Sequence, residues 1–330
     1  MIKFYLLSFF FAIPFSWARP NLRVITYQSF VSSYGPGDLI KKSFEKECEC
    51  ELTYEMIGNS GTLLNWLKLG GSLNKADVVL GIDSNDSDQA IEKKYFQSSQ
   101  VKMSVITEMK LSPRLGDLLV PFDQGVIAVM WDSEKLKNPP KNMDELISRK
   151  DLQKKLILPD PRFSSPGLAF MHWMKFIYGG NWSKKLPELR QQVLTVTPGW
   201  SEAYGLFVKG EAPLVVSYLT SEAYHRIVEK TDRYRALLFS SHLTVAEYAG
   251  VLSSSPNREL AIKFIDFLLK PSSQKIIAEK NWMLPMINAS KIPGINPWFL
   301  NLNLPSVQPI PPANPSEQKT IKELWLKEFR

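Results

Sequence analysis

Short apolar runs alternate with helical stretches along the first hundred residues, and this alternation constrains the fold more than any other feature. Leu22–Tyr27, Cys50–Ile57 and Ala76–Ile82 have the composition of strands. Apolar residues at helical spacing separate them, first after the turn Gly35–Gly37 and then over Thr62–Leu69. The third run is continuously apolar, as in a strand buried on both faces of a parallel sheet. This β-α-β-α-β order predicts a doubly wound α/β lobe.

A second lobe is expected because 330 residues exceed what one hydrophobic core usually supports. The segment Val120–Gly125 interrupts the pattern before a strand at Val126–Trp131, and we interpret it as the first crossing between lobes. Strands and helices then alternate again as far as Phe239. The strand Glu247–Leu252 and the helix Arg258–Leu269 are assigned back to the first lobe. The prediction is therefore a first lobe of residues 19–123 and 242–330 and a second lobe of residues 124–241.

The N-terminus has the features of an export signal. Lys3 supplies a positive charge, Phe4–Phe15 is an apolar run, and Ser16 and Ala18 are small residues at the positions that a signal peptidase reads. The run is too short to span a bilayer, which requires about 20 apolar residues. We expect residues 1–18 to be a cleaved signal peptide and the mature protein to be soluble and periplasmic.

Composition excludes several classes of function. The formal charge is +7, but lysines and arginines are interspersed with acids, so no nucleic-acid partner is expected. Two cysteines and three scattered histidines do not make a metal site. Motifs for a nucleophilic serine, a phosphate loop or a dinucleotide are absent from the sequence, so we expect no catalytic residues, no bound metal and no cofactor. Cys48 and Cys50 are interpreted as a buried or oxidised structural pair.

Two sets of residues are candidates for ligand contacts. Ser164 and Ser165 precede Pro166 and an apolar helix, which is either a plain N-cap or a site for a phosphate or carboxylate. Several aromatic residues stand at strand ends beside turns, where a flat or cationic ligand could stack on them. They are Tyr27, Tyr34, Trp200, Tyr218, Tyr224 and Trp282.

An exported α/β chain that crosses between two lobes more than once has the architecture of a periplasmic solute-binding protein. The predicted fold class is thus α/β and two-lobed, similar to type II of these proteins, with a hinged cleft between the lobes. Ligands in such proteins lie in the cleft, against strand ends and helix N-termini. Fold alone does not identify the ligand.

The chain resembles the periplasmic thiamine-binding proteins of bacterial ABC importers over nearly all of its mature length. The likeness weakens after Pro285, and the run Gly199–Phe207 (GWSEAYGLF) is its most specific part. The other matching segments, in the same order as in the family, are Tyr27–Phe30, Tyr34–Gly37, Cys48–Cys50, Lys75–Gly81, Val120–Asp123, Asp160–Arg162, Ser165–Leu168, Ser217–Tyr218 and Asn281–Met283.

The resemblance implies binding of thiamine and its mono- and diphosphate, and delivery to an inner-membrane ABC permease with a cytoplasmic ATPase. Thiamine carries a cationic thiazolium, a flat aminopyrimidine and an arm that can bear phosphate. Aromatic faces suit the rings, and serine hydroxyls at a helix N-terminus suit the arm. The residues that match the family's ligand contacts by position are Tyr27, Asn59, Ser60, Ser164, Ser165, Trp200, Tyr218, Leu219, Thr220, Ser221, Tyr224 and Trp282.

One matching position departs from the family. Where the family usually presents an acidic residue followed by glycine, this chain has Asn59 and Ser60. An asparagine can accept a hydrogen bond from the aminopyrimidine but offers the cation no counter-charge. We therefore expect weaker binding of unphosphorylated thiamine, with phosphate esters less affected.

Other functions remain open at this point. The chain could bind another organic cation or a ferric ion on the same architecture, although Tyr218 and Tyr224 do not form the adjacent pair expected of an iron site. Polyamine binding would need several acidic residues in the cleft, and we locate none from the sequence. A thiamine-degrading enzyme would need Cys48 or Cys50 as its nucleophile.

Overall fold

The computed structural model describes residues 19–71, 75–101, 106, 113–302, 304, 306–310 and 315–329. The predicted signal peptide lies outside these residues. In the described part, no helix combines the length and apolar character needed to cross a bilayer. The strands are β1 (Asn21–Thr26), β2 (Glu51–Met56), β3 (Val78–Asp83), β4 (Phe96–Gln97), β5 (Val120–Asp132), β6 (Leu156–Pro159), β7 (Val193–Thr197), β8 (Leu214–Tyr218), β9 (Tyr234–Leu237), β10 (Ser241–Leu252), β11 (Leu284–Pro285) and β12 (Ser306–Pro309).

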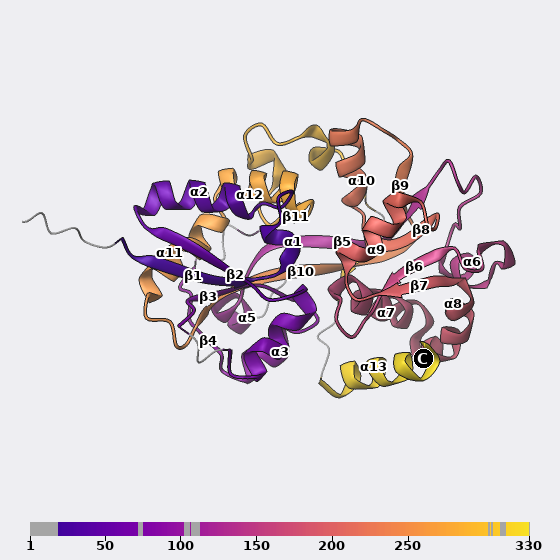
Figure 1. The fold of residues 1–330 in the computed structure, drawn as a ribbon, viewed down its shortest axis with the longest axis horizontal. Helices are drawn as coiled ribbons and strands as arrows, with labels where there is room; N and C mark the ends of the chain where they lie inside the picture. The colour runs from indigo at the N-terminus through magenta and orange to yellow at the C-terminus, as the bar shows by residue number, and fades with distance from the viewer. Residues whose placement is uncertain are drawn as a thin grey trace, which may run out of the picture.

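Helices cover the sheet in both lobes, as Figure 1 shows. Their boundaries agree with most of the predicted helical segments. The α-helices are α1 (Gln28–Val31), α2 (Gly37–Cys48), α3 (Leu63–Lys68), α4 (Ser87–Glu92), α5 (Pro113–Leu118), α6 (Met143–Ser148), α7 (Ser165–Tyr178), α8 (Leu186–Gln192), α9 (Trp200–Lys209), α10 (Ser221–Tyr224), α11 (Arg258–Leu268), α12 (Pro271–Ile276) and α13 (Pro315–Phe329).

Two long strands, β5 and β10, belong to both lobes. The main path of the sheet is β2-β1-β3-β10-β5-β8-β6-β7, in which β1 pairs parallel with β2 and β3, and β10 pairs antiparallel with β3 and β5. In Figure 1 the two crossing strands run through the middle of the molecule between the lobes. The two-lobed α/β prediction is confirmed. The expected interruption at Val120–Gly125 is wrong, because these residues form the first half of one continuous strand.

Each lobe has its own hydrophobic core. Strands β1 and β3 pack against α2 and α11 in the first lobe, where Phe44 and Phe264 lie edge to face with ring centroids 5.0 Å apart. The second lobe is centred on α7, whose Phe170 and Trp173 are fully buried. Cys48 and Cys50 form a disulfide between the end of α2 and the start of β2, so they are the oxidised structural pair that the sequence suggests.

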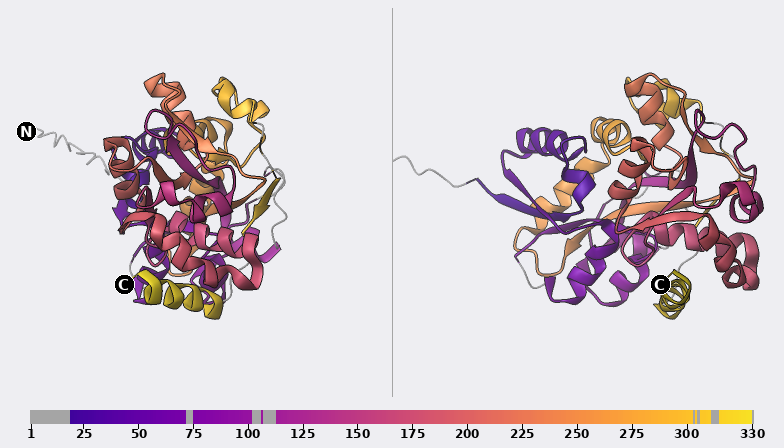
Figure 2. Two further views of the ribbon diagram at one scale, coloured as in Figure 1. Left: turned by 90° about the vertical axis from the view of Figure 1, so that its right-hand side faces the viewer. Right: turned by 45° about the vertical axis from the view of Figure 1, so that its right-hand side comes forward.

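The last helix packs on the second lobe. We predicted residues 242–330 to belong to the first lobe, but Ile321 and Trp325 of α13 are buried in the core of the second. Both views of Figure 2 show α13, in yellow, along one edge of the molecule. At its start Gln318 accepts a hydrogen bond of 2.9 Å from Gln89 of the first lobe and donates to the carbonyl of Asn85. Helix α13 therefore bridges the two lobes, which local sequence patterns could not show.

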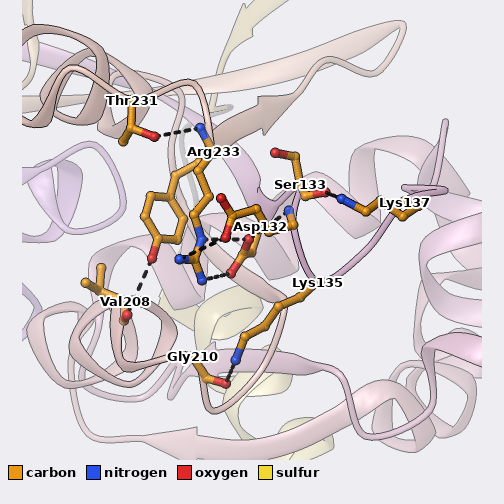
Figure 3. A network of polar contacts seen from close by, with 10 residues as sticks. Asp132, Ser133, Lys135, Lys137, Val208, Gly210, Thr231 and Arg233 are labelled. Atoms are coloured by element: carbon orange, nitrogen blue, oxygen red, sulfur yellow. Dashed lines mark hydrogen bonds and ion pairs between the residues drawn. The ribbon is translucent and has the colours of Figure 1, made fainter.

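An ion pair between a buried carboxylate and a half-buried arginine lies at the far end of β5. Asp132 ends that strand with no exposed surface, and Arg233 donates two hydrogen bonds to its carboxylate, of 3.0 and 2.7 Å (Figure 3). Burial acts to raise the pKa of Asp132, but the hydrogen bonds from Arg233 outweigh it, so the pKa lies below its usual value. The pair joins β5 to the segment that begins β9.

We predict that Arg233→Met lowers the free energy of unfolding by about 3 kcal/mol at neutral pH, because it leaves Asp132 buried and unpaired. Urea unfolding measures the difference. Lys319→Met is the control, since Lys319 and Glu323 form an exposed pair and its loss should cost under about 0.5 kcal/mol. The loss for Arg233→Met should shrink as pH falls through the lowered pKa of Asp132. An equal effect of the two variants would contradict this role.

Candidate functional site

A cavity of about 590 Å³ lies between the lobes, beside the crossing strands. Its walls come from both lobes: Tyr27 follows β1, Trp200 begins α9, Tyr218 ends β8 and Tyr224 ends α10. A second pocket of about 50 Å³ shares Tyr27, Trp200 and Tyr218 with it and extends toward α7. The two spaces together form one site with a wide aromatic part and a narrow polar part.

Aromatic side chains form most of the wide part. Trp200 stacks on Tyr204 with ring centroids 5.2 Å apart, and Tyr224 meets the edge of Trp282 at 5.5 Å. Trp282 has φ of 53°, a left-handed conformation that bulky residues rarely adopt. Such strain is maintained only where the surrounding structure compensates it, and here it accompanies a tryptophan in the cavity wall.

A chain of hydrogen bonds behind the wall holds these rings. The indole of Trp200 donates to Ser217 at 2.7 Å, and Ser217 is 2.8 Å from Ser221. Tyr204 is 2.7 Å from Nε2 of the buried His225, whose Nδ1 is 2.6 Å from Glu229. Because a carboxylate only accepts, His225 donates from Nδ1 and accepts the Tyr204 proton at Nε2. Burial lowers the pKa of His225, which favours this neutral form.

A carboxyl group, that of Glu247, lies at the floor of the cavity, and two further carboxyls flank it in the sheet. In the sheet, Glu247 of β10 pairs with Asp83 of β3 on one side and with Asp123 of β5 on the other. All three are buried, and Glu247 lines both parts of the site. Tyr27 donates a hydrogen bond of 2.5 Å to Glu247, and Asn281 donates one of 2.7 Å to Asp123.

The environment of this cluster favours protonated carboxyls. Burial raises the pKa of Asp123 to about 8, although hydrogen bonds from Asn281 and with Glu247 act in the opposite direction. Burial raises the pKa of Glu247 well above its usual value, and the charge of Asp123 adds to the effect. Burial also raises the pKa of Asp83. Each of these shifts favours the protonated form of the carboxyls at neutral pH.

The narrow part of the site is lined by hydroxyls at the start of α7. Ser164 is the N-cap of this 14-residue helix, yet its side chain makes no capping hydrogen bond. Its buried Oγ has no hydrogen-bond partner. Ser165 lies beside it, 3.5 Å from Asn85 of the first lobe. The structure thus shows no side-chain N-cap at Ser164, and a role of this motif in holding an anion stays a prediction.

The family model for bacterial extracellular solute-binding proteins matches residues 32–282. The chain belongs to this family. A thiamine-binding periplasmic protein of Brucella abortus is 42% identical over the whole chain and 97% of its own length. One from Escherichia coli K12 is 40% identical over 95% of this chain and 94% of its own. A solved periplasmic thiamin binding protein superposes with a TM-score of 0.85 at 39% identity, covering 94% of this chain and 96% of that one.

This solute-binding protein brings ten of the twelve predicted contact residues to the site. Leu219 and Thr220 lie in the same turn but line neither part: Leu219 packs in an apolar cluster with Val126 and Ala223, and Thr220 has no exposed surface. Their role as ligand contacts stays a prediction. The ten are Tyr27, Trp200, Tyr218, Ser221, Tyr224 and Trp282 in the wide part, and Asn59, Ser60, Ser164 and Ser165, with Tyr27, Trp200 and Tyr218 again, in the narrow part.

Sequence reasoning missed the acidic floor. From the sequence we locate no acidic residues in the cleft, but Glu247 lines the cavity, and Asp83 and Asp123 flank Glu247 in the sheet. A signal was present: Glu247 is the only charged residue in the otherwise buried run Val245–Leu252. Among the described residues, no group of three or more His, Cys, Asp or Glu side chains is arranged to hold a metal ion.

The two lobes of this solute-binding protein are in contact around the site. A Cβ on Gly61, in the loop after β2, would lie 2.6 Å from the carbonyl oxygen of Phe163 in the second lobe. Glycine thus allows the backbones of the two lobes to approach each other beside the narrow part. Gly125 allows a similar approach on the crossing strand β5, where a Cβ would lie 2.5 Å from the ring of Tyr218.

We predict that Asp123→Asn stabilises the empty protein by at least about 1 kcal/mol at pH 8 and by much less at pH 5. A carboxyl whose pKa is raised by folding costs stability as pH rises above its unfolded value, near 4, and the amide removes that cost. Asparagine can still accept the hydrogen bond from Asn281. Thermal unfolding at the two pH values measures the effect, and a pH-independent difference would contradict the raised pKa.

Proposed function

We propose that this protein is the substrate-binding component of a thiamine ABC importer. It would bind thiamine and its mono- and diphosphate between the lobes and deliver them to an inner-membrane permease with a cytoplasmic ATPase. The proposed location is the periplasm, reached through cleavage of residues 1–18. The function requires neither a cofactor nor chemical change of the ligand.

One observation carries the proposal: a single site joins an aromatic cavity with a carboxyl floor to a narrow pocket of serine hydroxyls. Flat rings with a delocalised positive charge fit the first part, through stacking and cation–π contacts of about 0.5–2 kcal/mol each. A phosphorylated arm fits the second, at the N-terminus of α7. The named relatives, at about 40% identity over nearly the full chain, support the same ligand.

Isothermal titration with thiamine tests the proposal. Wild-type protein should bind one equivalent, and Trp200→Ala should weaken binding at least tenfold, because it removes the stacking face and its hydrogen bond to Ser217. Trp131→Ala is the matched control, since Trp131 lies on β5 outside the site and its loss should change affinity by less than about threefold. Absence of thiamine binding by the wild type would refute the proposed ligand.

Asn59 provides a second test, of how the narrow part treats charge. Asn59→Asp places a carboxylate beside Ser60 and Ser164, so we expect thiamine to bind several-fold more tightly and thiamine diphosphate more weakly. Asn59→Ser is the uncharged control and should move both affinities in the same direction. Equal gains for the two ligands on Asn59→Asp, or no gain for thiamine, would refute the argument from counter-charge.

A further inference from the structure

Glu247 is a buried acid, and its ionised form would require a positively charged partner. It projects from the middle strand of three, and an acid on each neighbouring strand pairs with it. The side chains that act most strongly on its carboxyl are Asp123, Tyr27 and Asp83, and none of them carries a positive charge. Asp83 and Asp123 each keep one buried carboxyl oxygen without a hydrogen-bond partner.

The remaining groups around Glu247 do not neutralise it. Tyr218, at the end of β8, offers only a neutral phenol, because burial and then the charge of Glu247 raise its pKa. The other charged residues that line the cavity are Glu229, which is hydrogen-bonded to His225, and Lys280, which is exposed and forms no ion pair with Glu247. Strand pairing sets the Glu247 and Asp123 side chains side by side, and two buried carboxyls so placed repel each other when both are ionised, which favours one shared proton.

We propose that Glu247 selects a positively charged ring and that it does so by releasing a proton when the cation enters the cavity. The inference rests on the proposed function. In the empty site the proton is shared with Asp123. When the thiazolium arrives, the carboxyl O–H bond breaks, the proton passes to solvent and the carboxylate left behind balances the ring's charge. The ligand, and not a lysine or arginine of the protein, then supplies the positive charge beside this cluster of carboxyls.

Selectivity follows from this exchange. A neutral ring of the same shape cannot compensate an ionised carboxylate, so it binds to the protonated site and gains no charge interaction. A cationic ligand gains the interaction, and its binding releases one proton to solvent. Its affinity should therefore rise with pH across the range in which the empty cluster is still protonated. Tyr27 remains bonded to Glu247 in either state.

Calorimetry on the wild-type protein tests the proton release directly. Thiamine is titrated near neutral pH in PIPES and in Tris, whose ionisation enthalpies differ, and the difference in apparent binding enthalpy counts the protons released. We expect roughly 0.5–1 proton for thiamine. We expect none for an analogue in which a neutral thiophene replaces the thiazolium. Thiamine binding without release, or equal affinity for the two ligands, would overturn the inference and leave the proposed function standing.

Glu247→Gln tests the residue. The amide can still accept the hydrogen bond from Tyr27, and we expect thiamine to bind about 10- to 100-fold more weakly, without proton release, while the thiophene analogue keeps its affinity within about threefold. Glu211→Gln, at an exposed position outside the site, is the matched control and should behave as the wild type. Equal weakening of both ligands by Glu247→Gln would mean that the residue only shapes the cavity.

Discussion

Two strands shared by both lobes determine where a ligand can bind in this protein. Strands β5 and β10 pair with each other at the boundary, and each runs from one lobe into the other. Strand ends and turns of both lobes therefore surround the space beside them. The same pairing brings Asp123 and Glu247 together in the sheet. The arrangement of the lobes and the chemistry of the floor thus depend on the same pair of strands.

The sequence is informative where local pattern decides structure. Period-two and helical spacing located most strands and helices, and aromatic residues beside turns, such as Trp200 and Tyr224, do line the cavity. Patterns fail where distant segments meet. Asp83 and Glu247 become neighbours only through strand pairing, and Tyr204 and His225 only through packing. Helix α13 was assigned to the wrong lobe because its amphipathic face does not indicate its partner.

The site also changes the meaning of Asn59. Considered alone, an amide at a position where the resemblance implies an acid suggests a weak site for a cation. The structure provides another carboxyl, Glu247, on the floor shared by both parts of the site. Asn59 lies in the narrow part, near Ser164 and Ser165, where a neutral amide does not repel a phosphate. Charge in this site is thus divided, with a carboxyl at the floor of the wide part and hydroxyls around the narrow part.

A crystal structure of the protein grown with thiamine monophosphate tests the account most directly. It should show the thiazolium within about 5 Å of the Glu247 carboxyl, aromatic faces of Tyr27, Tyr224 or Trp282 against the rings, and the phosphate at Ser164 and Ser165. A ligand bound elsewhere, or bound in the reverse orientation with its phosphate over Glu247, would contradict it.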